Sequence, residues 1–174
     1  MALVLTVDDL LEYTTWQRAR WRAWFRDHPA ALALSAGPHG DGRFGSVGDL
    51  VKHVFSAEQR YVQRLNGQSL TDLAAIASDD IDAVFAAGET GRRTLVELLR
   101  DFHADQWDSP REFVIIGYNV TATPKKIVVH VLLHEIRHWA QIATLCRLNG
   151  LVPEFHDFLG SPVWGGTFGQ ASGR

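Results

Sequence analysis

The stretch from His130 to Gln141 reads HVLLHEIRHWAQ and lies in a long apolar segment near the end of the chain. Its three histidines, His130, His134 and His138, are spaced four residues apart. On an α-helix, a four-residue step carries the side chain only about 40° past a full turn, so the imidazoles form a nearly straight stripe along one face. Neighbouring members would have Cβ atoms about 5–6 Å apart, close enough for two of them to bind one metal ion. The spacing therefore predicts a helix with a metal site on it.

A buried stripe of histidines needs partners for its ring nitrogens. Each imidazole carries a donor and an acceptor, and burying them without a partner costs free energy. A metal ion would be a partner for several rings at once. Three consecutive positions at this spacing span roughly 12 Å, more than one ion with bonds of about 2.0–2.1 Å can easily bridge. We therefore expect two adjacent members of the stripe to be ligands.

Helix signals place this stripe in the last of four helices. Thr123-Pro124 is a cap followed by proline at the first helical position, and Asn149-Gly150 is a stop signal. These signals predict a helix over residues 124–148. Its apolar residues lie almost all round, which predicts the most buried helix of the four. Apolar periodicity with similar start and stop signals predicts three earlier helices, over about 7–26, 46–66 and 78–102, the third capped by Ser78.

The sequence therefore predicts an all-α fold. This fold is a four-helix bundle with a long connection before the last helix and a C-terminal tail. Residues 103–123 form that connection, and the apolar run 113–118 within it predicts a small strand or hairpin. We expect residues 1–150 to form the bundle with the metal site. Residues 151–174 should pack partly on the bundle through their aromatic side chains, with the last few residues loose.

Composition limits the classes of function. The 174 residues are 46% hydrophobic and 21% charged, with a net charge of -3, which is typical of one soluble globular domain. This charge, and the lack of a Lys/Arg-rich tract, give no basis for nucleic-acid binding. No stretch approaches the about 20 apolar residues of a membrane span, and the N-terminus is too short of apolar residues for a signal peptide. The single cysteine, Cys146, excludes an internal disulfide framework and is expected in the core. We expect a cytoplasmic protein that acts on a small molecule.

A histidine on another helix could complete the metal site, because bundles build such sites from inward side chains on facing helices. His53 lies at the edge of the apolar face of the predicted second helix, near Ala57. Together with two members of the stripe it would give three imidazoles, which suit Zn²⁺, Ni²⁺ or a similar divalent ion. Three protein ligands leave a position open for water or substrate, which is typical of a reactive site. The remaining histidines have no such pattern and are expected on the surface or in loops: His28, His39, His103 and His156.

These residues together resemble the DinB/YfiT-like superfamily of metal-dependent enzymes. The similarity rests on Lys52-His53-Val54 and on the 130–141 stretch, and it extends from the first helix to the end of the last. In that family the metal ligands are one histidine on the second helix and a pair four apart on the last helix. The resemblance therefore implies His53, His134 and His138 as the ligands here.

The end of the motif departs from the family pattern. The family's last helix commonly continues His-Arg-Gly-Gln, whereas this chain has His138-Trp139-Ala140-Gln141. Gln141 fits the pattern, and the two residues before it do not. This departure leaves the ligand triad intact, but the motif no longer identifies the subfamily.

The resemblance also implies an activity. Characterised branches of the family include low-molecular-weight thiol S-transferases and a thiol-dependent isomerase, in which the metal would activate the thiol by lowering its pKa. It implies for this chain a transferase, or a related hydrolase or isomerase, that acts on a small electrophile. A divalent metal ion and a low-molecular-weight thiol would be its cofactors. The family also suggests a homodimer, for which the aromatic-rich first helix is the candidate surface.

Three further residues could support the metal site. Gln141 lies on the same stripe, one turn beyond His138, and could orient a ligand ring. His130 could be a fourth ligand, support a ligand or line the pocket. Glu135 lies about 60–100° around the helix from the two ligands, which favours a surface salt bridge or a hydrogen bond that supports the site. An anionic substrate would need a cation at the pocket mouth, and the candidates, each also interpretable as a surface charge, are Arg92, Arg93 and Arg137.

Two other functions fit the same residues. A non-catalytic metal-binding stress-response protein would use the site to stabilise the bundle or to sense metal. A zinc metalloprotease would use residues 134–138 as H-E-x-x-H, with Glu135 as general base and Glu154 or His156 as third ligand. The metzincin extension is missing, because Gln141 and Thr144 stand where it has glycine and histidine. The four-helix layout and His53 favour the bundle enzyme.

Overall fold

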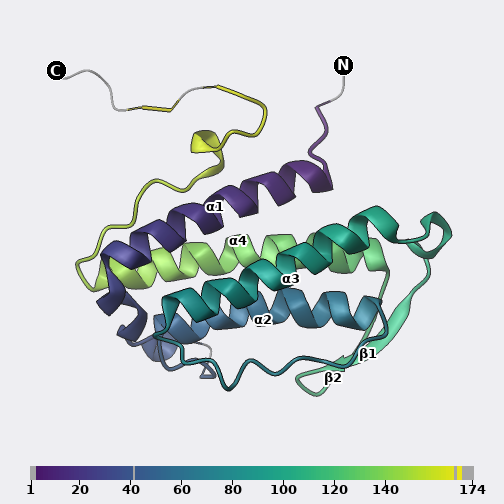
Figure 1. Cartoon of the computed structure of the whole chain (residues 1–174), viewed down its shortest axis with the longest axis horizontal. Coiled ribbons are helices and arrows are strands. Elements are labelled where there is room, and N and C mark those ends of the chain that lie inside the picture. The colour runs from purple at the N-terminus through teal and green to yellow at the C-terminus, as the bar shows by residue number, and fades with distance from the viewer. Residues whose placement is uncertain (1–2, 41, 167, 170–174) are drawn as a thin grey trace.

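The computed structural model describes residues 3–40, 42–166 and 168–169. Within these residues the chain forms four long α-helices that pack together, and one β-hairpin (Figure 1). The helices are α1 (Val7–Asp27), α2 (Val47–Leu65), α3 (Ile81–Asp101) and α4 (Pro124–Leu148). The predicted four-helix bundle is therefore confirmed, with helix ranges close to those expected from the sequence.

Short polar side chains begin each helix. Thr6 and Ser46 form capping boxes with Asp9 and Asp49, in which each pair satisfies two backbone N–H groups. The start of α3 differs from the prediction, because Asp80 and not Ser78 is its cap. The Ser78 hydroxyl instead donates a 2.5 Å hydrogen bond to Asp49, which ties the loop before α3 to the start of α2.

The predicted hairpin is present in the long connection before α4. Strands β1 (Arg111–Ile115) and β2 (Tyr118–Ala122) are antiparallel, and Phe113 pairs with Val120. The two turn residues, Ile116 and Gly117, both have positive φ angles (49° and 79°), as a two-residue type I′ hairpin turn requires. Phe113 contacts Tyr61 of α2 edge-on, so the hairpin lies against the bundle near the C-terminal half of α2. It forms one wall of the pocket described below.

The centre of the bundle is aromatic. Trp21 of α1 stacks on Trp139 of α4 with 5.3 Å between ring centroids, and Phe55 of α2 meets Trp139 edge-on. Trp21, Trp24 and Phe25 are buried, so these aromatic side chains of α1 belong to the core, and the homodimer stays a prediction.

The prediction that α4 is the most buried helix is wrong. α4 buries 12 of its 25 residues, whereas α2 buries 10 of its 19. α4 lies at the surface along one stripe, which includes Leu133, Arg137 and Thr144. The mostly apolar composition of α4 did not reveal this stripe, because Leu133 and Ala140 contribute apolar residues to the solvent-facing side.

The tail after α4 runs back along α1 (Figure 1). Tyr13 donates a 3.0 Å hydrogen bond to the carbonyl of His156, and the Trp164 indole donates to Asp9. The expectation of loose final residues concerns residues 170–174, which lie outside the described part of the chain.

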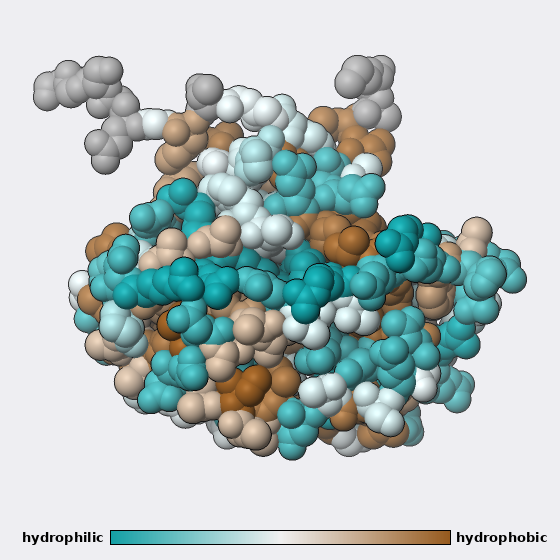
Figure 2. All heavy atoms as spheres, in the orientation of Figure 1, coloured by the Kyte–Doolittle hydropathy of each residue, from teal (hydrophilic) through white to brown (hydrophobic). Residues whose placement is uncertain are grey.

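Hydrophilic side chains form a band across one face of the molecule. Figure 2 shows this band crossing the molecule at the level of α3, with hydrophobic areas above and below it. Of the helices that the structure describes, none combines the length and apolar character needed to cross a membrane.

Candidate metal centre

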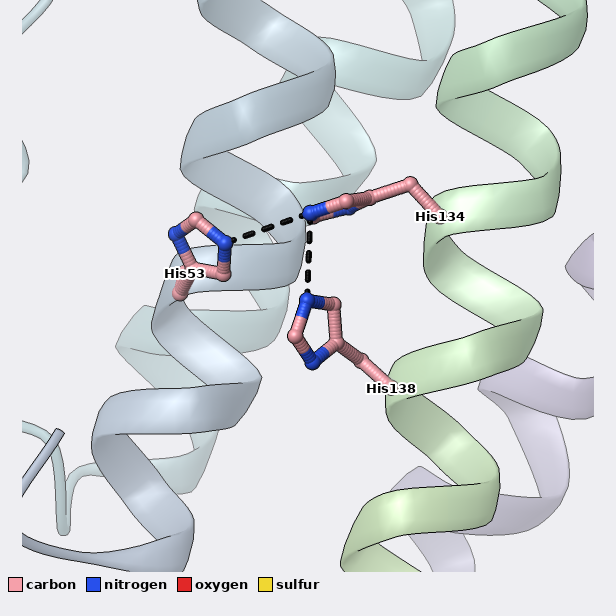
Figure 3. Close-up of side chains that lie close together, drawn as sticks. All are labelled: His53, His134 and His138. Carbon is pink, nitrogen blue, oxygen red and sulfur yellow. Dashed lines mark hydrogen bonds between the residues drawn. The ribbon is translucent and has the colours of Figure 1, made fainter. Parts of the chain in front are cut away.

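Three histidines from two helices converge in the bundle (Figure 3). His134 Nε2 lies 3.3 Å from His53 Nε2 and 3.1 Å from His138 Nε2, and one nitrogen of each ring lies within 4.8 Å of the others. Ligand nitrogens around a tetrahedral ion with bonds of about 2.0–2.1 Å are about 3.3–3.4 Å apart. We call these three residues the histidine cluster. Its dimensions are those of a site that could hold one metal ion.

The helix packing explains this convergence. His134 and His138 lie one turn apart on α4, and their rings point to the same side. His53 comes from the facing side of α2, and its ring meets both others edge-on at about 5 Å between centroids (5.0 Å and 5.1 Å). The pair on α4 follows from local spacing, whereas the third ring arrives only because α2 packs against α4.

The surroundings keep the central ring neutral. Burial, and to a smaller extent repulsion from His138 and His53 in their charged forms, together lower the pKa of His134 to about 2. A neutral imidazole has a free ring-nitrogen lone pair, which is the form that binds a divalent ion.

Gln141 fixes the ring of His138. His138 Nδ1 lies 2.7 Å from Gln141 Oε1, so the Nδ1–H donates to the amide oxygen and leaves Nε2 facing the cluster. The Gln141 amide nitrogen in turn donates to the backbone carbonyl of His39. The loop before α2 therefore supports a ring on α4, a role for His39 that no side-chain pattern in the sequence indicated.

One side of the cluster opens into a pocket of about 390 Å³. We call it the basic pocket, because its described lining includes the four arginines Arg43, Arg60, Arg64 and Arg137. His53 and His134 form its inner end, and residues 114–116 of the hairpin form an apolar wall. Arg137 was one of the candidate cations expected from the sequence, and its Nη2 lies 3.3 Å from His138 Nε2.

Arg60 and Arg64 were not predicted from the sequence as pocket residues, although a signal was present. They follow His53 by seven and eleven residues, and both steps return to within about 20° of the same helix face. A search for cations on the face of His53 would have found both.

Comparison with known proteins agrees with the fold. A family model described as the DinB family matches residues 3–167. The chain belongs to the DinB family. YizA of Bacillus subtilis (strain 168), described as an uncharacterized protein, is 24% identical over 154 residues, which is 86% of this chain and 91% of that protein. The family predicted from the 130–141 stretch and His53 is thereby confirmed.

His130 lies outside the cluster of this DinB-family chain. Its ring centroid is 5.6 Å from that of His134, and it is exposed on α4, with its ring edge-on to Tyr61. The described group of candidate ligands contains His53, His134 and His138 only. His130 instead lines an apolar pocket of about 340 Å³ between α4 and the hairpin.

The position of Glu135 differs from one of the two roles predicted for it. The predicted surface salt bridge is wrong, because Glu135 is only 1% exposed. Its carboxylate accepts two 2.7 Å hydrogen bonds from Arg18 of α1, one of 2.7 Å from Arg92 of α3 and one of 3.0 Å from the Trp139 indole. Arg92 is likewise buried, contrary to its interpretation as a surface charge.

This environment counts against Glu135 as a protease general base. Its oxygens are engaged by Arg18, Arg92 and Trp139, and these arginines outweigh the effect of burial and hold its pKa below the ordinary value. The two candidate third ligands of a protease lie beside α1, where Glu154 pairs with Arg20 and the ring of His156 packs on Trp21.

Glu58 of α2 completes a buried ion cluster, formed by Arg18, Glu58, Arg92 and Glu135. Glu58 Oε2 lies 3.0 Å from a nitrogen of each arginine. Burial disfavours the charge of Arg18, but the two carboxylates outweigh it and raise the pKa of the guanidinium above its ordinary value. One residue from each helix contributes, so the ion cluster joins the whole bundle.

The other residues considered from the sequence lie in the core or at the surface, outside the histidine cluster. Cys146 is buried in the core as predicted, and burial raises the pKa of its thiol to about 11, which keeps it protonated. His28 stacks on Trp24, and His103 is exposed before the hairpin.

Proposed function

We propose that this DinB-family protein is a metal-dependent enzyme that transfers a low-molecular-weight thiol to a small electrophile. His53, His134 and His138 would hold one divalent ion. The observation that carries the proposal is the convergence of their ring nitrogens beside a pocket, with His134 Nε2 at 3.3 Å and 3.1 Å from the other two, close to the spacing in a tetrahedral ligand set.

The residues around the cluster support a reactive site over a purely structural one. A structural ion is usually enclosed by four protein ligands, whereas a catalytic ion keeps a position for water or substrate. Here His130 lies outside the candidate ligand group, and the basic pocket reaches His53 and His134.

The chemistry follows from neutral nitrogen ligands. A divalent ion in such a site lowers the pKa of a bound thiol, so that a thiolate is available at neutral pH. Gln141 would hold His138 in the tautomer that leaves Nε2 available. The three nitrogen ligands suit Zn²⁺ or Ni²⁺.

Metal content is the first test. Protein purified without an affinity tag or chelator should contain close to one equivalent of metal by plasma mass spectrometry. The His53→Ala variant should lose it, because two ligands remain, and the exposed His103→Ala control should keep it. Retention of metal by His53→Ala would contradict the proposed triad.

Thiol activation is the second test. Cobalt-substituted protein should develop a sulfur-to-cobalt absorption band in the near ultraviolet when 2-mercaptoethanol is added. The metal-loaded wild type should also transfer that thiol to 1-chloro-2,4-dinitrobenzene faster than His53→Ala does. A cobalt site that binds no thiol and gives no transfer would overturn the proposed reaction while leaving the metal site in place.

A further inference from the structure

We propose that the basic pocket binds a small organic anion, with its carboxylate or phosphate held by Arg60 and Arg64 of α2 and by Arg137 of α4. The reaction partner that enters this pocket would then be an acid. As a statement about the substrate, this inference rests on the proposed function, whereas anion binding itself can be tested independently.

The three arginines surround one space beside the histidine cluster. Arg60 and Arg64 are one turn apart on α2, on the same face as His53, and both line the pocket. Arg137 reaches it from the opposite helix, where its Nη2 approaches His138 Nε2 at 3.3 Å. An acid group among them would be held from two helices and would lie beside the cluster.

These charges lack carboxylate partners. Among the described residues, no carboxylate lines the basic pocket, and none forms a salt bridge with Arg60, Arg64 or Arg137. On α1, by contrast, Arg20 pairs with Glu154, and Arg22 and Arg26 both pair with Asp82. Burial and the charge of Arg60 both lower the pKa of Arg64, which shows that its charge is poorly compensated. A bound anion would provide that compensation.

The pocket also has an apolar side. Phe44, Tyr61 and hairpin residues Val114 and Ile115 contribute to its lining. A volume of about 390 Å³ is in the usual range of small-molecule sites. The net charge of the whole chain is -3, so the four arginines of the pocket stand out against an acidic chain. These features fit a small acid with a short carbon body.

Ligand-observed saturation-transfer NMR can test this with succinate and its neutral diamide, succinamide. The wild-type protein should bind succinate about tenfold more tightly than succinamide, because charge-assisted hydrogen bonds to the arginines are available only to the acid. The preference should fall to within about twofold in an Arg60→Gln/Arg64→Gln variant. It should persist in Arg93→Gln/Arg147→Gln, which makes the same change in net charge on exposed parts of α3 and α4.

The outcomes separate this inference from the proposed function. Equal binding of the acid and the amide by wild type, or an unchanged preference in the Arg60→Gln/Arg64→Gln variant, would overturn the anion site even if metal is bound. The same titration is made with His53→Ala, with circular dichroism as the check on folding. A preference for succinate that persists there without metal would support the anion site even if the metal-dependent function fails. A preference that depends on metal and not on the arginines would overturn it.

Discussion

Two polar clusters lie next to each other in this bundle and differ in how their groups are satisfied. His134 belongs to the histidine cluster, and the following residue, Glu135, belongs to the ion cluster. In the ion cluster, two arginines and two glutamates are buried and pair across all four helices. In the histidine cluster, ring nitrogens face one another beside a pocket. The opposite charges of the first set balance one another, whereas the second set is suited to an added cation.

The comparison shows how structural and functional polar groups can be told apart within one core. Buried charges are tolerated when they pair with good geometry, and removing one partner leaves an uncompensated charge. His134 Nε2 lies at hydrogen-bond distance from both of the other imidazoles, but it can share a proton with only one of these two neighbours, which leaves a ring-nitrogen lone pair that a metal ion would satisfy. Changes in the ion cluster should therefore act on stability, and changes in the histidine cluster on metal binding.

Breaking the ion cluster should have the largest effect. Glu135→Gln removes the carboxylate that binds both Arg18 and Arg92, and should lower the free energy of unfolding by about 3–5 kcal/mol. Urea denaturation followed by circular dichroism measures this loss. Glu97→Gln, an exposed change on the same bundle, should have little effect. A loss from Glu135→Gln below about 1 kcal/mol would mean that the ion cluster contributes little to stability.

Removing the central histidine should abolish the stabilisation by metal and leave the metal-free stability almost unchanged. With free metal at about a hundred times its Kd, the wild type should gain about 2.7 kcal/mol, or roughly 5–10 °C in Tm. His134→Ala should lose this gain, because His134 lies between the other two rings. Its metal-free stability should stay close to that of wild type, since no buried ion pair is broken. Differential scanning fluorimetry with and without zinc checks both parts, and a metal-dependent Tm gain that survives in His134→Ala would contradict the comparison.

In metal-free protein, the pH dependence of the free energy of unfolding should distinguish the two clusters. The folded-state pKa of His134 is lowered from 6.5 to about 2, so below pH 6.5 the unfolded chain takes up a proton that the folded chain does not. The free energy of unfolding should therefore fall below pH 6.5, by at most about 1.4 kcal/mol per pH unit for this group.

The ion cluster should respond in a more acidic range. The folded-state pKa of Glu135 is lowered from 4.5, so its contribution is fully present above 4.5 and is lost as the pH falls through the folded value. Denaturation of metal-free protein at a series of pH values measures the pH dependence of stability in both ranges. The His134→Ala variant, measured beside wild type, identifies the part that comes from His134. A wild-type slope between pH 6.5 and 5 that the variant keeps unchanged would show that His134 is not its source.

The smallest effect should come from the residue that supports a ligand. Gln141→Ala removes the acceptor of His138 Nδ1–H and should weaken metal binding about tenfold, or about 1.4 kcal/mol, with all three ligands kept. Competition with a chelating dye measures the affinity. Thr144→Ala, one turn along α4 and exposed, is the matched control. Equal affinities in the two variants would show that the bond from His138 to Gln141 does not support the site.

Local patterns in the sequence determined the four helices, the Thr123 cap of the last one and the pair formed by His134 and His138. These features depend on the period of the α-helix and on side chains that bond to nearby backbone groups, so they extend over a few residues. The apolar pattern of the second helix made His53 a candidate for the third ligand, and the family resemblance implied the same residue. The position of His53 on the inward edge of α2 was consistent with that assignment.

Only the tertiary structure decided the partners that come from distant parts of the chain. Glu135 was correctly placed at an angle to the ligands, but its burial depends on Arg18 and Arg92, which lie 117 and 43 residues away. The support of Gln141 by the His39 carbonyl spans 102 residues and involves a backbone atom. Arg60 and Arg64 share a face with His53, yet only the packing of α4 and the hairpin turns that face into a pocket. The sequence by itself therefore determined which helix faces carry the chemistry, and packing decided which groups meet, because helical periodicity specifies direction around an axis but not the neighbour in that direction.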